Sequence, residues 1–364
     1  MPIGNIRTHL GEALQWSPAG QAGGGDALVA AVAMAAPAAL GFATSQPQAG
    51  IAAALGAMMA TGATLSGGTV AGYLREQAWI LLATVVAVLA LSLLAGADSV
   101  SLSGTPTLLG AVVLAGVMGL AALLGGVGYG AAVLSVRFML FLLLLRGSVA
   151  GAAGTDGALL FAAVAGGVLW CTLLGCLMML SGPGRRPVGE TLDQTRPALS
   201  WRRWWGRLRR YDGWHYPLRL LSGVALALVF EVFYPRWDLH WMALTVVLLS
   251  ERRPVAVLSV KATQRALGTV AGVLLASSLL LATPAAWLLV LCIAVLAALR
   301  VLLRHRNYLA YSVIMTPLLV LMMDAAQPPD PEILPERLVA TLAGVALVML
   351  CNALLPSPRP VAAR

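Results

Sequence analysis

The stretch from Leu239 to Ser277, LHWMALTVVLLSERRPVAVLSVKATQRALGTVAGVLLAS, contains two apolar runs separated by positive charge. The first run, Leu239 to Ser250, is twelve residues long, and residues 251–265 then carry four basic residues and one acidic residue. Apolar segments joined by a basic loop are typical of a membrane hairpin whose tip faces the cytoplasm. We therefore expect a membrane protein in which this loop is cytoplasmic.

The composition supports the same class over the whole chain. Of the 364 residues, 59% are hydrophobic and 11% are charged, whereas a soluble domain carries about 25% charged residues. The apolar runs are continuous, while the strands of an outer-membrane barrel alternate between apolar and polar residues. We predict an all-α integral membrane protein with about twelve transmembrane helices.

Breaks in the apolar runs divide the chain into five segments. They are an N-terminal cytoplasmic segment at 1–25, a six-helix membrane repeat at 26–181, a basic linker at 182–216, a second six-helix repeat at 217–355 and a cytoplasmic tail at 356–364. The predicted spans lie at about 27–44, 49–66, 77–96, 106–125, 129–145, 158–181, 217–233, 239–250, 266–282, 285–303, 307–323 and 338–355.

Loop charges predict the orientation. If the N-terminus is cytoplasmic, the inner loops of the second half carry seven basic residues and the outer loops two, as the positive-inside rule requires. An even number of spans then places both termini in the cytoplasm. Six spans in each half also make the two halves a parallel repeat. Aligning Tyr129 with Tyr308 places Arg137 opposite Thr316, and Arg75 aligns with Arg265.

The linker at 182–216 carries eight arginines and three acidic residues. Its aromatic residues Trp201, Trp204, Trp205 and Tyr211 fall on one helical face together with Leu208. This pattern is typical of an interfacial helix on anionic lipid headgroups. An RNA-binding arm would look similar, but the segment lies between two membrane halves, and we expect no nucleic-acid partner.

The sequence contains no phosphate loop, nucleophile elbow, paired-carboxylate site or metal cluster. We therefore expect no enzyme activity, no cofactor and no metal, and instead movement of a solute across the membrane. Ionisable residues at membrane depth are the first candidates for such a role. Arg137, about eight residues into the fifth span, could bind an anionic substrate; pairing with a carboxylate or reaching out to water are the alternatives.

The second half resembles the fusaric acid resistance family, which includes the aromatic carboxylic acid exporters. The likeness rests on Trp241-Met242-Ala243-Leu244-Thr245, Pro254, Arg265-Ala266-Leu267-Gly268-Thr269-Val270-Ala271-Gly272 and Asn307-Tyr308, in the family's order W-x-x-L-T, P, R-x-x-G-T-x-x-G and N-Y. It extends over residues 217–355 and is weaker in the first half.

The resemblance implies a multi-pass protein of the bacterial inner membrane that exports small organic anions, such as aromatic acids, with proton coupling. Its partners would be the lipid bilayer, the organic anion, and either a second copy of the chain or an accessory periplasmic adaptor. Plant relatives with a similar six-span unit behave as anion channels, so a passive channel is one alternative. A membrane scaffold that transports nothing is another.

These arguments define a set of candidate site residues. We interpret the short run at 239–250 as a half-helix lining a cavity, which Trp241 and Thr245 would face, with Arg265 near its cytoplasmic end. Glu231 and Asp324 close spans on the outer side and are candidates for proton coupling, with solvated span ends as the alternative. The full substrate-binding prediction comprises Arg137, Trp241, Thr245, Arg265, Tyr308 and Thr316.

Overall fold

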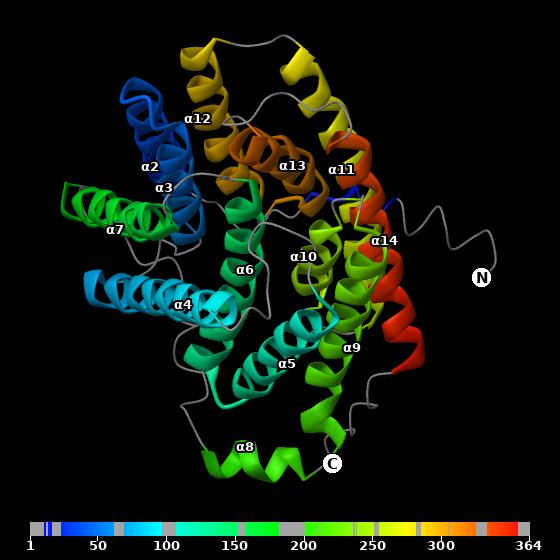
Figure 1. Cartoon of the computed structure of the whole chain (residues 1–364). Coiled ribbons are helices and arrows are strands. Elements are labelled where there is room, and N and C mark those ends of the chain that lie inside the picture. The colour runs from blue at the N-terminus through cyan, green and yellow to red at the C-terminus, as the bar shows by residue number, and fades with distance from the viewer. Residues whose placement is uncertain are drawn as a thin grey trace.

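The computed structural model describes residues 11, 14–16, 23–61, 69–96, 107–151, 157–181, 201–209, 211–235, 237, 239–250, 255–281, 285–304, 306–324 and 333–355. The described regular elements are helices, which confirms the all-α prediction for this part of the chain (Figure 1). The helices of the first half are α2 Gly24–Ala43, α3 Pro47–Ala60, α4 Val70–Gly96, α5 Leu108–Leu124, α6 Tyr129–Gly151 and α7 Gly157–Ser181. The short α8 Trp201–Leu208 follows, and then α9 Tyr211–Phe233, α10 His240–Leu249, α11 Val255–Leu281, α12 Ala286–Leu303, α13 Tyr308–Asp324 and α14 Ile333–Leu354.

Within the described ranges, seven helices are long and apolar enough to cross a membrane, namely α2, α4, α7, α9, α11, α12 and α14. Long helices such as α4 expose leucine and valine on one side, including Leu82, Leu89 and Leu93. Exposed apolar faces of this kind suit a lipid environment. Length, composition and exposure together describe a multi-pass membrane protein.

Helices α3 and α10 differ from the long helices in length and burial. At 14 and 10 residues, they measure about 21 Å and 15 Å, against roughly 30 Å for the hydrocarbon layer. Nearly every residue of α10 and ten residues of α3 are buried. Both helices therefore lie inside the protein, surrounded by longer helices, and their ends need partners from the protein itself.

The packing of each helix in one half has a counterpart in the other half. α3 packs against α2 and α7, and α10 packs against α9 and α14. In the same way, α4 contacts α6 and α7, while α11 contacts α13 and α14. Contacts between the halves are matched in the same way. The contact of α2 with α12 corresponds to that of α9 with α5, and the contact of α6 with α10 corresponds to that of α13 with α3 (Figure 1).

Glycine allows the closest of these contacts. A Cβ atom on Gly272 would lie 2.6 Å from Thr316 Cβ and 2.8 Å from the Val313 carbonyl oxygen. Gly268, one turn earlier, meets Ser312 in the same way. The glycine pair of the R-x-x-G-T-x-x-G motif therefore packs α11 against α13, as small residues at helix interfaces do.

Several helix boundaries differ from the predicted spans. α4 begins at Val70 rather than 77, α11 at Val255 rather than 266, and α9 at Tyr211 rather than 217, while α6 continues to Gly151 rather than 145. The predictions stopped spans at charged residues, but a charge that is paired or that lies at the protein interior does not end a helix. Lys261 and Arg265 are consequently helical and do not belong to a loop.

Candidate functional site

The C-terminal end of α3 is the meeting point of side chains from three other helices. The last carbonyl groups of a helix lack partners within the helix, and those of α3 lie at Met58, Met59 and Ala60. Gln77 Nε2 on α4 donates a hydrogen bond to the Ala60 carbonyl at 3.1 Å. The hydroxyl of Thr61 donates to the Met58 carbonyl at 2.7 Å, so this helix end is satisfied by local groups and by groups from other helices.

Two arginines complete this arrangement. Arg137 Nη1 on α6 donates to the Met59 carbonyl at 2.9 Å, and Arg300 Nη2 on α12 donates to the Met58 carbonyl at 3.0 Å. Arg300 also donates to the hydroxyl of Thr61. Positive charge at a helix C-terminus is favourable because the helix dipole places partial negative charge there.

Further charged side chains lie near the two arginines at the C-terminal end of α3. Arg304 and Glu76 lie within electrostatic range of Arg137, and Arg304 is also within range of Arg300. Arg300 is 8% exposed, and its Nε has no hydrogen-bond partner among the described residues. Three guanidinium groups with one nearby carboxylate form a cationic cluster that could hold an anion.

Aromatic residues adjoin this cluster. Tyr311 lies within electrostatic range of both Arg137 and Arg300, and its ring stacks on that of Tyr308 with centroids 5.7 Å apart. Lys261 Nζ lies 5.1 Å from the Tyr308 ring centroid. Guanidinium groups bind carboxylates through paired hydrogen bonds, and tyrosine rings offer stacking faces. The combination suits an aromatic acid.

Two of the predicted substrate-binding residues, Arg137 and Tyr308, belong to this constellation. Arg265 lies on α11, 4% exposed, and its Nε has no hydrogen-bond partner in the described part of the chain. Thr316 Oγ1 donates to the Ser312 carbonyl at 3.0 Å, and its Cβ faces Gly272. Thr316 therefore takes part in the packing of α11 on α13.

Trp241 and Thr245 on α10 both lie against α14. The guanidinium of Arg337 stacks on the Trp241 ring, 3.4 Å from its centroid. Thr245 faces Gly344, where an added Cβ would lie 2.9 Å from Thr245 Cβ. Both side chains are buried in helix packing, so the structure does not bring them together with Arg137.

Of the two candidates for proton coupling, Glu231 has a described partner and Asp324 does not have a described side chain. Glu231 accepts two hydrogen bonds from Arg146, at 2.6 and 3.1 Å, with both side chains about nine-tenths buried. Arg146 lies on α6 and Glu231 on α9, so the pair joins the two halves. Asp324 is the last residue of α13, and its side chain lies outside the described residues.

Sequence reasoning missed Arg300, Arg146 and Gln77. Arg300 is one of the seven basic residues that the sequence analysis counts in the inner loops of the second half, although it lies three residues inside the end of α12. The available signal was the shortness of the apolar run before Thr61, because a helix that ends inside the protein needs cationic or amide partners. Among the described residues, no three His, Cys, Asp or Glu side chains gather as metal ligands would.

Comparison with known families gives one match. Residues 223–351 match the family described as fusaric acid resistance protein-like. The matched region covers α10 to α13, the C-terminal part of α9 and most of α14, and it confirms the resemblance predicted from the W-x-x-L-T and R-x-x-G-T-x-x-G motifs. No curated protein and no solved structure matches the chain.

Proposed function

We propose that the chain is a proton-coupled exporter of small organic anions, in particular aromatic carboxylates, in the bacterial inner membrane. One observation carries this proposal: Arg137 and Arg300, from opposite halves of the chain, converge on the buried end of α3 beside a pair of stacked tyrosines. The family match over residues 223–351 supports a membrane exporter or resistance protein.

The chemistry of the cluster supports binding of a carboxylate. A guanidinium has five N–H donors, and the described contacts use one Nη of Arg137 and one of Arg300. The remaining donors can pair with the two oxygens of a substrate carboxylate. The rings of Tyr308 and Tyr311 would then lie against the aromatic part of the substrate, and stacking of this kind would favour aromatic over aliphatic acids.

The site opens toward the cytoplasm in this proposal. Arg137 is eight residues from the start of α6, a depth of about 12 Å. Asn307, the residue before Tyr308, donates hydrogen bonds from its Nδ2 to the carbonyls of Leu14 and Gln15, each at 3.4 Å. The N-terminal segment therefore lies at the same end as the tyrosine pair, the end that the loop charges assign to the cytoplasm.

The matched helix contacts of the two halves support a parallel six-helix repeat with an axis along the membrane normal. Arg137 belongs to one half and Arg300 to the other. A rotation of one half against the other would separate the two guanidinium groups and lower the affinity for the anion. Binding at one orientation and release at another is the requirement for export.

In this proposal, proton coupling acts through the Arg146–Glu231 pair. It joins α6 and α9 nine residues beyond Arg137 along α6, about 14 Å away. Protonation of Glu231 would remove the charge attraction and leave a buried Arg146 without its counter-ion, which is unfavourable. The halves would then separate at this end, so that one proton moves the protein between its two orientations.

Flux in proteoliposomes tests this proposal. Vesicles containing the purified protein would be supplied with radiolabelled benzoate, and uptake would be followed with and without an imposed pH gradient. We expect a gradient to accelerate uptake several-fold and to drive accumulation above equilibrium. Equal initial rates without accumulation would indicate a passive anion channel, and no flux of any aromatic acid would indicate a scaffold.

A further inference from the structure

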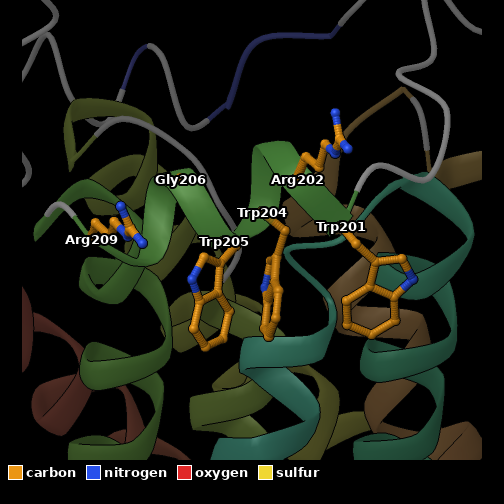
Figure 2. A pocket seen from close by; sticks show the side chains of 6 residues that line it. All are labelled: Trp201, Arg202, Trp204, Trp205, Gly206 and Arg209. Atoms are coloured by element: carbon orange, nitrogen blue, oxygen red, sulfur yellow. The ribbon is translucent and has the colours of Figure 1, made fainter.

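Helix α8 has two chemically different sides. Over residues 201–209 it carries four arginines and three tryptophans and no acidic residue. Figure 2 shows the rings of Trp201, Trp204 and Trp205 on one side of the helix and the Arg202 side chain on the opposite side. Three indoles on one side of a short helix and an arginine on the other are an arrangement found at a membrane–water interface.

α8 is held at the end of α5 by two hydrogen bonds. Trp204 Nε1 donates to the Leu123 carbonyl at 2.9 Å, and Arg207 Nη2 donates to the Gly126 carbonyl at 2.6 Å. A Cβ on Gly126 would lie 3.0 Å from Trp204 Cδ1, so the indole lies close against the turn between α5 and α6. The position of α8 relative to the membrane helices is thereby determined.

The two other indoles are exposed. Trp201 and Trp205 are 60% and 58% exposed, and they border a hollow lined by Trp201, Arg202, Trp204, Trp205, Gly206 and Arg209 (Figure 2). Their rings point to the side on which the helices α5 and α9 lie (Figure 2). α8 contacts α9 and lies across the direction of that helix (Figure 1).

We propose that this hollow binds the headgroup of an anionic phospholipid of the inner leaflet. Arg202 and Arg209 supply the positive charge at the level of the phosphate-bearing headgroup, while Trp201 and Trp205 lie at the boundary between headgroups and acyl chains, where indoles are enriched. The charge of the segment is complementary to an acidic lipid. This inference requires only a membrane-embedded chain and is independent of the transported substrate.

The direction of the indoles favours lipid over nucleic acid. Bases that stack on tryptophan approach from water, but Trp201 and Trp205 face the side occupied by the apolar helices. An acyl chain can reach that side, whereas a solvated polynucleotide cannot. The bound lipid would also stabilise the α5–α6 turn, because α8 is hydrogen-bonded to it.

Binding of a labelled lipid tests the proposal on the full chain. The protein in neutral detergent would be titrated with fluorescent phosphatidylglycerol and with phosphatidylcholine of the same acyl chains. We expect tighter binding of phosphatidylglycerol, weakened by about tenfold or more in Arg202→Gln/Arg209→Gln, since each arginine near an anionic surface contributes measurably. Arg75→Gln, which removes an exposed arginine from α4, is the matched control and should leave the affinity unchanged.

A second variant keeps the test independent of charge. Trp201→Ala/Trp205→Ala retains the arginines and the Trp204 anchor, and it should weaken phosphatidylglycerol binding while leaving thermal stability near that of the parent. Equal affinity for the two lipids, or an unchanged affinity in both double variants, would overturn the proposal. Displacement of phosphatidylglycerol by submicromolar RNA would overturn it in favour of a nucleic-acid site.

Discussion

Arg146 and Glu231 form a buried ion pair between the halves, and neither charge could remain alone in that environment. Removing one partner from a buried pair costs about 3–5 kcal/mol, because the other charge loses its compensation. We expect Arg146→Met and Glu231→Leu each to destabilise the protein by this amount. The double variant Arg146→Met/Glu231→Leu should recover much of the loss, since the site then holds two apolar side chains.

Reversible unfolding of the four proteins in mixed micelles would measure the coupling energy of the pair. If the double variant loses as much free energy of unfolding as the two single variants together, the two residues do not stabilise each other, and the proposed role of the pair is contradicted. A stable double variant would also separate function from folding. It should retain substrate binding but lose the acceleration by a pH gradient.

At this scale the sequence predicted the residue types better than their partners. Arg137 could be identified because placing a charged side chain inside a membrane span costs free energy, so such a residue is a candidate for a functional role. Its hydrogen bond to Met59 could not be predicted, since 78 residues separate the two. Arg300 was misassigned because a position near the end of an apolar run looks the same whether the side chain reaches water or a buried helix end.

At the scale of helices, glycine decides how closely α3 and α7 approach. A Cβ on Gly167 would collide with the backbone of Ala53 on α3, and one on Gly56 would collide with the backbone of Val164 on α7. Backbone atoms cannot move aside as a flexible side chain does. We expect Gly167→Ala to destabilise the fold by about 3 kcal/mol or more, at the upper end of overpacking effects.

Gly166 provides a matched control for this prediction. A Cβ at Gly166 meets nothing within 4 Å, so Gly166→Ala should leave the yield and melting temperature of the detergent-solubilised protein unchanged or slightly raised. Similar melting temperatures for Gly167→Ala and the parent protein would contradict the close α3–α7 contact.

Helix existence was well predicted and helix ends were not. The short helix at His240–Leu249 agrees with the length of its apolar run. In contrast, α11 continues through Lys261 and Arg265, because these residues find partners or cover within the protein. Hydropathy indicates which segments can enter lipid. Where a helix with buried charged residues begins depends instead on its tertiary contacts.

At the scale of the whole molecule, the proposed topology of twelve spans with cytoplasmic termini makes a direct prediction. In a chain whose four cysteines are replaced, Ser200→Cys in the linker should react with a membrane-impermeant maleimide only after the cells are opened. Ser101→Cys, between α4 and α5, should react in intact spheroplasts. Labelling of both positions from the same side would contradict the proposed topology.

The central claim is that Arg137 and Arg300 bind the substrate anion through their charge, beyond their hydrogen bonds to the end of α3. Arg137→Gln and Arg300→Gln keep an N–H donor for the α3 carbonyls but remove the charge. Gln77→Ala removes the contact to the Ala60 carbonyl and leaves the charge unchanged, so it is the matched control for the stability of this helix end.

The decisive measurement is the initial rate of pH-gradient-driven uptake of labelled benzoate by these three variants in proteoliposomes, each first shown to be folded by its melting temperature. We predict that Arg137→Gln and Arg300→Gln lose at least about tenfold in rate at low substrate concentration, since a charged hydrogen bond contributes roughly 1.5–3 kcal/mol. Gln77→Ala should retain most of the parental rate. Parental rates in both arginine variants would contradict the claim.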